Sequence, residues 1–328
     1  MSEEKRNNLV VSAAPHVCNP VDTASIMRDV IIAMMPALLV AIYVFGFRAL
    51  VLTAVCAAAC VVFEWGVRKI MGRDNTIRDL SAVVTGILIA FNCPVNVPIW
   101  MAIVGCFIAI VCVKQLFGGL GQNFANPAIV ARIALFVGFA TPMTTWTVTS
   151  KMDPAIIAAA GDAVTGASPL AMLTKGLEMP SNMSMFLGLC NGSMGEISAL
   201  ALIIGGIYMV VRKVIDAYIP VAFIATAFIL SLLMGYDPIF QICAGGIMLG
   251  AIFMATDYVT SPMNPAGKII FGVGCGLMTM LIRKFGSYPE GVSFAILLMN
   301  VLAPQIDSWT VSKLNGVPKE SKKKGGAE

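Results

Sequence analysis

The residues best suited to chemistry lie in one short polar segment, residues 162–170. It reads Asp-Ala-Val-Thr-Gly-Ala-Ser-Pro-Leu and holds a carboxylate, two hydroxyls and a Gly-Ala pair within a few positions. Gly166 and Ala167 put no bulky side chain beside the hydroxyl of Ser168, and glycine also permits a sharp turn. Pro169 fixes the backbone after that serine. The segment can therefore present one hydroxyl to which another molecule is attached. The same pattern also fits an ordinary Asp/Gly/Pro turn or a helix cap.

The composition places this segment in a membrane protein. Of the 328 residues, 58% are hydrophobic and only 12% are charged. A soluble globular chain carries roughly 25% charged residues, so this chain has too few polar groups to cover a water-facing surface. No signal peptide is evident, because the first 28 residues begin with Ser-Glu-Glu-Lys-Arg after the initial Met and contain no continuous apolar core. These residues are expected to form a cytoplasmic arm.

The nine cysteines do not predict a metal centre. None of them forms a Cys-x-x-Cys pair, and five lie within apolar stretches, where cysteine usually packs as a small apolar residue. The single histidine, His16, lies in the N-terminal arm. We therefore expect no metal site and no iron–sulfur site within this chain alone, although a cluster shared with a partner could use one of its cysteines.

The hydrophobic pattern predicts ten membrane spans of about 20 residues or fewer. They are expected at residues 29–47, 49–67, 79–93, 98–115, 127–141, 197–211, 219–235, 239–256, 268–283 and 290–306. Breaks rich in Gly, Pro and Asn lie at residues 92–98, 118–127 and 256–265. Broken backbone at membrane depth survives only where protein or a cavity satisfies its polar groups. We therefore expect these breaks to face protein or a cavity.

Basic residues set the expected orientation, since Lys and Arg concentrate in cytoplasmic segments. With the N-terminus inside, the cytoplasmic segments hold 16 of the 22 basic residues and the outer segments hold five. This predicts a multi-pass protein of the cell inner (cytoplasmic) membrane with both termini cytoplasmic and a long outer loop at residues 142–196. Arg283 and Lys284, in a short outer connection, are the exception to the rule.

Weak sequence similarity between the two halves of the chain predicts that the spans form two repeats. Residues 86–92 resemble residues 250–256, and the Phe-Gly pair at 117–118 resembles the one at 285–286. Five spans is an odd number, so two five-helix repeats would be inverted, with their functional site at the interface between them. The fold class is thus an all-α polytopic membrane protein with ten transmembrane helices in two inverted five-helix repeats. The expected regions are the arm 1–28, the first repeat 29–141, the outer loop 142–196, the second repeat 197–306 and a basic cytoplasmic tail 307–328.

These features together resemble one family. It contains RnfD, a membrane component of the ion-translocating ferredoxin:NAD⁺ oxidoreductase known as the Rnf complex, and NqrB, its counterpart in the sodium-translocating NADH:quinone reductase. The resemblance covers nearly the whole chain and rests on residues 122–127, 162–170, 192–196 and 245–257. The length of the chain is similar to that of RnfD, since NqrB is longer at its N-terminus.

The resemblance implies a covalently bound flavin. In that family a flavin transferase reads the motif Asp-x-x-Ser/Thr-Gly-Ala-Ser/Thr and links the phosphate of FMN to the last hydroxyl through a phosphoester. The matching positions here are Asp162, Thr165, Gly166, Ala167 and the acceptor Ser168. The usual acceptor is Thr, and Ser keeps the nucleophilic hydroxyl. Riboflavin is implied as a second, non-covalent flavin, for which no motif gives a position.

The resemblance also implies that the chain functions as one subunit of a larger complex. The chain would relay electrons through FMN between partner subunits, including iron–sulfur and second flavin subunits, and the transfer would be coupled to Na⁺ or H⁺ transport. The reaction would belong to the complex, and we assign this chain no catalytic residue of its own. It contains no Gly-x-Gly-x-x-Gly dinucleotide motif, so NAD is expected to bind elsewhere. Membrane lipid is an expected partner, and nucleic acid is not.

Charged residues near or inside spans are candidates for function. Asp257, after the eighth span, is a candidate for the ion path, with a helix cap or a partner contact as the alternative. Glu64 is expected at the membrane interface. Arg132, inside the fifth span, is expected to pair with a carboxylate or to reach toward the interface.

Three other functions compete with the flavin-carrying role of an RnfD-type protein. The chain could be an NqrB-like component of a quinone reductase. It could also be a solute channel, since the fold of this family is similar to that of urea transporters. A scaffold without redox chemistry is the third alternative.

Overall fold

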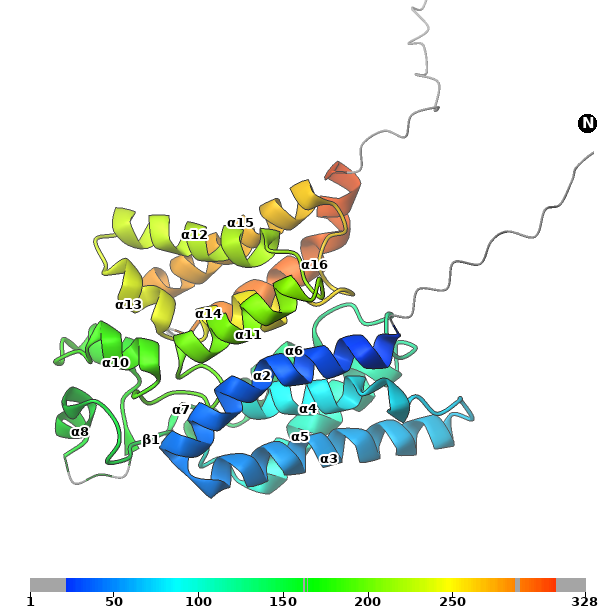
Figure 1. The fold of residues 1–328 in the computed structure, drawn as a ribbon, viewed down its shortest axis with the longest axis horizontal. Coiled ribbons are helices and arrows are strands. Elements are labelled where there is room, and N and C mark those ends of the chain that lie inside the picture. The colour runs from blue at the N-terminus through cyan, green and yellow to red at the C-terminus, as the bar shows by residue number, and fades with distance from the viewer. Residues whose placement is uncertain (1–21, 162, 164, 287–289, 311–328) are drawn as a thin grey trace, which may run out of the picture.

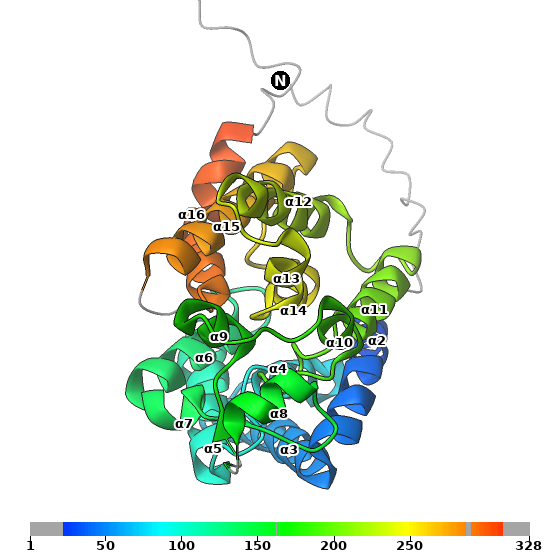
Figure 2. The same cartoon turned by 90° about the vertical axis from the view of Figure 1, so that its left-hand side faces the viewer.

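The apolar stretches of the sequence fold as helices that form two groups, one from each half of the chain (Figure 1). The computed structural model describes residues 22–161, 163, 165–286 and 290–310. The N-terminal group, blue to cyan, lies against the C-terminal group, green to red, and the connecting loop covers one end of both (Figures 1 and 2). The start of α2 and the end of α16 lie at the other end of the bundle (Figure 1).

The first half begins with two long apolar helices. The carboxylate of Asp22 accepts a hydrogen bond of 2.7 Å from the backbone N–H of Thr23, and α2 (Thr23–Phe45) begins there, six residues before the expected start of the first span. Gly46, with a φ of +80°, lets the chain reverse into α3 (Phe47–Ile70). The half continues with η1 (Ile77–Asp79), α4 (Ser81–Phe91), α5 (Ile99–Phe107), the π-helix η2 (Ile108–Gln115) and α6 (Pro127–Gly138).

The outer loop folds into short elements. They are α7 (Ala140–Thr144), β1 (Trp146–Thr147), α8 (Pro154–Ala160), β2 (Thr165–Gly166), α9 (Pro169–Lys175) and α10 (Asn182–Leu187). Strands β1 and β2 pair antiparallel as a two-stranded ribbon, which the all-α expectation did not include.

In the second half, the described residues form one interrupted helical segment and four continuous helices. Its elements are α11 (Ala199–Val211), α12 (Tyr218–Leu233), α13 (Pro238–Cys243), α14 (Ile247–Leu249), the π-helix η3 (Gly250–Met254), α15 (Pro265–Phe285) and α16 (Val292–Thr310). Within the described residues, four helices are long and apolar enough to cross a membrane, namely α2, α3, α15 and α16, and shorter apolar helices accompany them. The chain is therefore a helical, multi-pass membrane protein.

The break expected after the eighth span, at residues 256–265, is confirmed, since η3 ends at Met254 and α15 begins at Pro265. The sequence did not predict a second break, in which the helix stops after Cys243 and restarts at Ile247. Gly245 and Gly246 both have positive φ values, +65° and +75°, which glycine adopts without strain. The backbone carbonyls freed by this break need partners inside the protein.

Arg283 supplies those partners. Its guanidinium donates hydrogen bonds to the carbonyl oxygens of Gln241, Ala244 and Gly245 at 2.6, 2.7 and 3.2 Å. The residue lies in the last turn of α15 and is buried. This arginine therefore caps a broken helix inside the protein, and its expected place on the outer side of the membrane stays a prediction.

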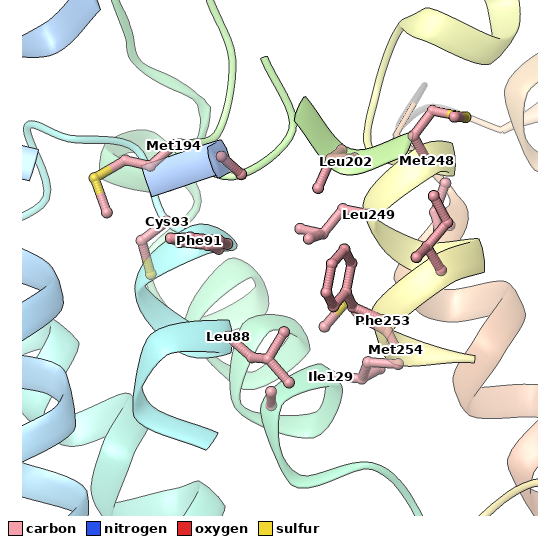
Figure 3. Close-up of a cluster of buried hydrophobic side chains, with 14 of the residues drawn as sticks. Leu88, Phe91, Cys93, Ile129, Met194, Leu202, Met248, Leu249, Phe253 and Met254 are labelled. Atoms are coloured by element: carbon pink, nitrogen blue, oxygen red, sulfur yellow. The ribbon is translucent and has the colours of Figure 1, made fainter. Parts of the chain in front are cut away.

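The two halves meet through small and apolar side chains. Helix α2 packs against α11, where a Cβ on Gly205 would lie 2.1 Å from the carbonyl oxygen of Ala33. Figure 3 shows another part of the contact between the halves, where Phe91 of α4 and Ile129 of α6 face Leu249 of α14 and Phe253 of η3. Close approach through small residues is the usual way in which membrane helices associate. The helices of the two halves therefore pack together directly, and the outer loop joins the end of one half to the start of the other.

Candidate functional site

An open pocket of about 560 Å³ lies between the outer loop and the helix ends beneath it. Its wall contains motif residues 165–168, together with Phe136, Trp146, Lys175 and Glu290. Aromatic rings, hydroxyls and a lysine are groups that can hold a flat, partly polar ligand. Asp162, the first residue of the motif, lies outside the described residues.

Ser168 links the ribbon to α9 and lines this pocket. Its Oγ accepts a hydrogen bond of 3.2 Å from the backbone N–H of Ala171, so the serine is the N-cap of α9. The helix-cap alternative for this position is thus observed. A cap uses a lone pair of the hydroxyl oxygen, so capping alone does not consume the hydroxyl proton. The residue is 7% exposed and is part of the pocket wall.

The backbone before Ser168 is held from two sides. Thr165 pairs with Thr147 and Gly166 pairs with Trp146 in the ribbon. The carbonyl oxygen of Ala167 accepts a hydrogen bond of 2.6 Å from the amide of Asn191, a residue only 2% exposed.

A buried charged network forms the floor below the loop. Arg132 donates to a carboxylate oxygen of Glu290 at 2.6 Å and to the amide oxygen of Asn92 at 2.8 Å. The carboxylate of Glu196 lies 3.7 Å from the same guanidinium. These side chains come from α6, from the end of α4 and from the segments just before α11 and α16. The prediction that Arg132 pairs with a carboxylate is confirmed, and the guanidinium faces two of them.

Glu290 is the member of this network that lines the pocket, and it precedes the first residue of α16. Burial raises the pKa of its carboxyl to about 7; Arg132 opposes this shift, and the negative charge of Glu196 adds to it. Burial therefore favours the protonated form of this carboxyl, and the guanidinium of Arg132 favours the ionised form.

A second polar region lies at the other end of α4. There Lys114 donates to the carboxylate of Glu64 at 2.9 Å and to the hydroxyl of Ser81 at 2.8 Å. The side chain of Glu64 is 1% exposed and pairs with Lys114 inside the protein, and its expected place at the membrane interface stays a prediction. Lys114 and Asp257 line a shared pocket of about 100 Å³, in which the carboxylate of Asp257 accepts a hydrogen bond from Thr260 at 3.1 Å.

Sequence reasoning missed Asn191, Glu290 and the buried role of Glu64. Glu196 was noted only as part of a family segment. Glu290 lies 158 positions from its partner Arg132, and Asn191 lies 24 positions from Ala167, so no local pattern reveals these contacts. The one available signal was the presence of charged residues in mostly apolar surroundings.

The fold and this site define a class of protein, a helical integral membrane protein that carries a hydroxyl-lined pocket on a loop at one end of the bundle. The chain belongs to the NQR2, RnfD, RnfE family, whose model matches residues 10–316.

Its relatives match it over nearly their whole length. It is 49% identical to the D subunit of the Na⁺-translocating ferredoxin:NAD⁺ oxidoreductase complex of Acetobacterium woodii, over 96% of this chain and 98% of the relative. It is 42% identical to the D subunit of the proton-translocating ferredoxin:NAD⁺ oxidoreductase complex of Clostridium ljungdahlii, over 93% of this chain and 96% of the relative. It is 34% identical to the D subunit of an ion-translocating oxidoreductase complex of Halorhodospira halophila, over 93% and 94% of the two chains.

Proposed function

We propose that this chain is the flavin-carrying membrane subunit of an ion-translocating ferredoxin:NAD⁺ oxidoreductase complex. The observation that carries the proposal is the near full-length similarity to the D subunits of such complexes, together with the acceptor motif lining an open pocket. On this proposal, electron transport through the chain is coupled to movement of Na⁺ or H⁺, and the other Rnf subunits supply the iron–sulfur and further flavin centres. An NqrB-like role in a quinone reductase is the less favoured assignment, because the relatives named above are all D subunits of ferredoxin-linked or ion-translocating oxidoreductase complexes.

The proposal assigns FMN to Ser168 through a phosphoester made by a flavin transferase. The residues fit such a group, because the pocket next to the Ser168 hydroxyl measures about 560 Å³ and has aromatic and polar walls. When bound, FMN supplies one- and two-electron chemistry. Thr165, Gly166 and Ala167 would hold the acceptor backbone, and Trp146 and Phe136 would exclude water from one side of the pocket. Riboflavin is included as a second, non-covalent flavin.

The ten-span, two-repeat arrangement belongs to the same proposal. It is supported by the packing of α2 on α11 and of α6 on α16, which joins corresponding helices of the two halves. The basic residues support an arrangement with both termini in the cytoplasm and the outer loop on the other side of the membrane.

The test is the mass of the peptide spanning residues 152–175 after expression with the transferase. We expect it to gain the mass of FMN less one water, and the denatured protein to fluoresce under ultraviolet light. Ser168→Ala should abolish both signals, whereas Ser168→Thr should keep them.

Ser181→Ala is the matched control. Ser181 also caps a short helix of the outer loop, since its Oγ accepts from the backbone N–H of Ser184 at 3.1 Å. This variant loses a cap but should retain the flavin. A bare Ser168 in the native protein isolated with its partner subunits would contradict the proposal. Riboflavin should appear in the supernatant after denaturation of the same sample.

A further inference from the structure

The side chain of Asn191 lies directly behind the acceptor loop. Its Nδ2 donates to the carbonyl oxygen of Ala167 at 2.6 Å. That carbonyl belongs to the peptide group that joins Ala167 to Ser168. One hydrogen bond therefore fixes the orientation of the backbone immediately before the acceptor.

Gly166 is part of the same contact. A Cβ on Gly166 would lie 2.9 Å from a methyl group of Val148 and 3.6 Å from Nδ2 of Asn191. A larger residue at this position would push the loop away from the amide. The glycine of the motif is thus needed where the loop meets Asn191 and the ribbon.

The segment that contains Asn191 is held by backbone hydrogen bonds to the end of α4. Three residues further on, the backbone N–H of Met194 donates to the carbonyl of Cys93 at 3.2 Å, and that of Gly195 donates to the carbonyl of Phe91 at 3.0 Å. A Cβ on Gly195 would lie 2.4 Å from the Cβ of Phe91, so the two segments are in direct contact. Residues 191–196 are therefore anchored to the end of α4, in the body of the protein.

A small chamber lies below the acceptor, lined by Ser168, Asn191 and Glu196 among others. Its volume is about 10 Å³, close to that needed for one water molecule. Within the described residues, Oδ1 of Asn191 and Oε2 of Glu196 have no hydrogen-bond partner. Buried polar atoms of this kind require a partner, which a water in the chamber would provide.

We propose that Asn191 is a positioning residue that presents the Ser168 hydroxyl for flavin attachment. The inference rests on the proposed function, since it concerns the same hydroxyl. In the attachment step, a bond forms between Oγ of Ser168 and the phosphorus of a flavin donor. The phosphoanhydride bond of that donor, a flavin dinucleotide, breaks, the other half of the donor leaves as a nucleoside monophosphate, and the hydroxyl proton passes to a base of the transferase. No electron is transferred. Asn191 acts by holding the Ala167 carbonyl, so that Oγ stays in one place relative to the pocket.

The experiment measures attachment to the full-length protein produced without transferase. The folded, monodisperse protein in detergent is mixed with the transferase and a flavin dinucleotide, and the mass of peptide 152–175 is followed with time. Asn191→Leu has a similar volume but neither donates nor accepts a hydrogen bond. Asn182→Leu is the matched control, because the Asn182 amide also makes a side-chain hydrogen bond from the outer loop, to Asp237 at 2.7 Å.

We expect Asn191→Leu to lower kcat for attachment about fivefold, the factor that corresponds to one net hydrogen bond. The KM for the acceptor protein should stay unchanged, because the surface that docks on the transferase is intact. Asn182→Leu should react at close to the native rate. A purely structural role for Asn191 would lower the yield of folded protein and leave kcat of the folded fraction unchanged.

Native kcat in Asn191→Leu would overturn the inference. If that variant yields no monodisperse protein, Asn191→Ser provides the test, since its shorter side chain cannot reach the Ala167 carbonyl and should show the same loss of kcat. Failure of the native protein and of Ser181→Ala to accept any flavin would instead refute the proposed function.

Discussion

Replacing Arg132 should destabilise the protein more than replacing Arg132 and Glu290 together. The guanidinium is buried and contacts Glu290 at 2.6 Å and Glu196 at 3.7 Å, so Arg132→Met leaves two buried carboxylates without their shared counter-ion. Breaking a buried ion pair from one side costs about 3–5 kcal/mol. The side chain of Glu290 is 18% exposed and can take up a proton, so we expect the lower end, about 3 kcal/mol.

The double variant Arg132→Met/Glu290→Gln removes most of the uncompensated charge. Glu196 keeps its hydrogen bond from the backbone N–H of Ser193 at 3.0 Å. We expect the double variant to lose about 1–2 kcal/mol, because replacing both partners of a buried pair is often nearly neutral. The difference between the double variant and the sum of the single variants measures the pair itself.

Thermal unfolding of the purified protein in detergent at neutral pH is the assay. A loss of about 3 kcal/mol corresponds to a fall in Tm on the order of 5 °C. Arg48→Met is the control, since this exposed arginine donates to the carbonyl oxygens of Val95 and Asn96, which are not carboxylates. A Tm for Arg132→Met within about 1 °C of that of Arg48→Met (a margin of roughly 0.5 kcal/mol), or strict additivity in the double variant, would refute the reasoning.

Three further predictions address other parts of the molecule. Folding raises the pKa of Glu290 from 4.5 to about 7, so the contribution of this carboxyl to the free energy of unfolding should fall as pH rises from 4.5 to 7. Glu290→Gln should therefore flatten the dependence of Tm on pH. Gly205→Ala should lower the stability by about 1–3 kcal/mol in the same melts, since the added methyl would meet the Ala33 carbonyl, whereas Gly138→Ala, which has open space, should not. Asp257→Asn should reduce ion transport by the assembled complex in vesicles while flavin content stays normal; unchanged transport would remove this carboxylate from the ion path.

The sequence was most informative where the signal is local. Composition identified the membrane class, and the apolar runs predicted the regions that form α2, α3, α15 and α16. Pro, Gly and Asn predicted interrupted helices, and residues 162–170 were identified as a short polar segment whose acceptor role stays a prediction. Each of these signals depends on residues close together in the chain.

Contacts between distant segments could not be predicted. A buried charge is stable only when a partner neutralises it, and the partner of Arg132 lies 158 residues away. The capping role of Arg283 could not be predicted for the same reason, since its acceptors are carbonyls of another helix and its broken end, 38 to 42 residues earlier in the chain. Charge counting treats every arginine as exposed to solvent, and this one replaces the missing hydrogen bonds of a broken helix.

The anchoring of residues 191–196 to the end of α4 has a practical consequence for labelling. An epitope inserted there would detach residues 191–196 from α4 and disturb the backbone before Ser168, which Asn191 holds. Residues 176–179, between α9 and α10, are all exposed. An affinity tag placed at Glu178 should therefore leave the fold intact, and antibody staining of whole cells would then report directly on which side of the membrane this loop resides.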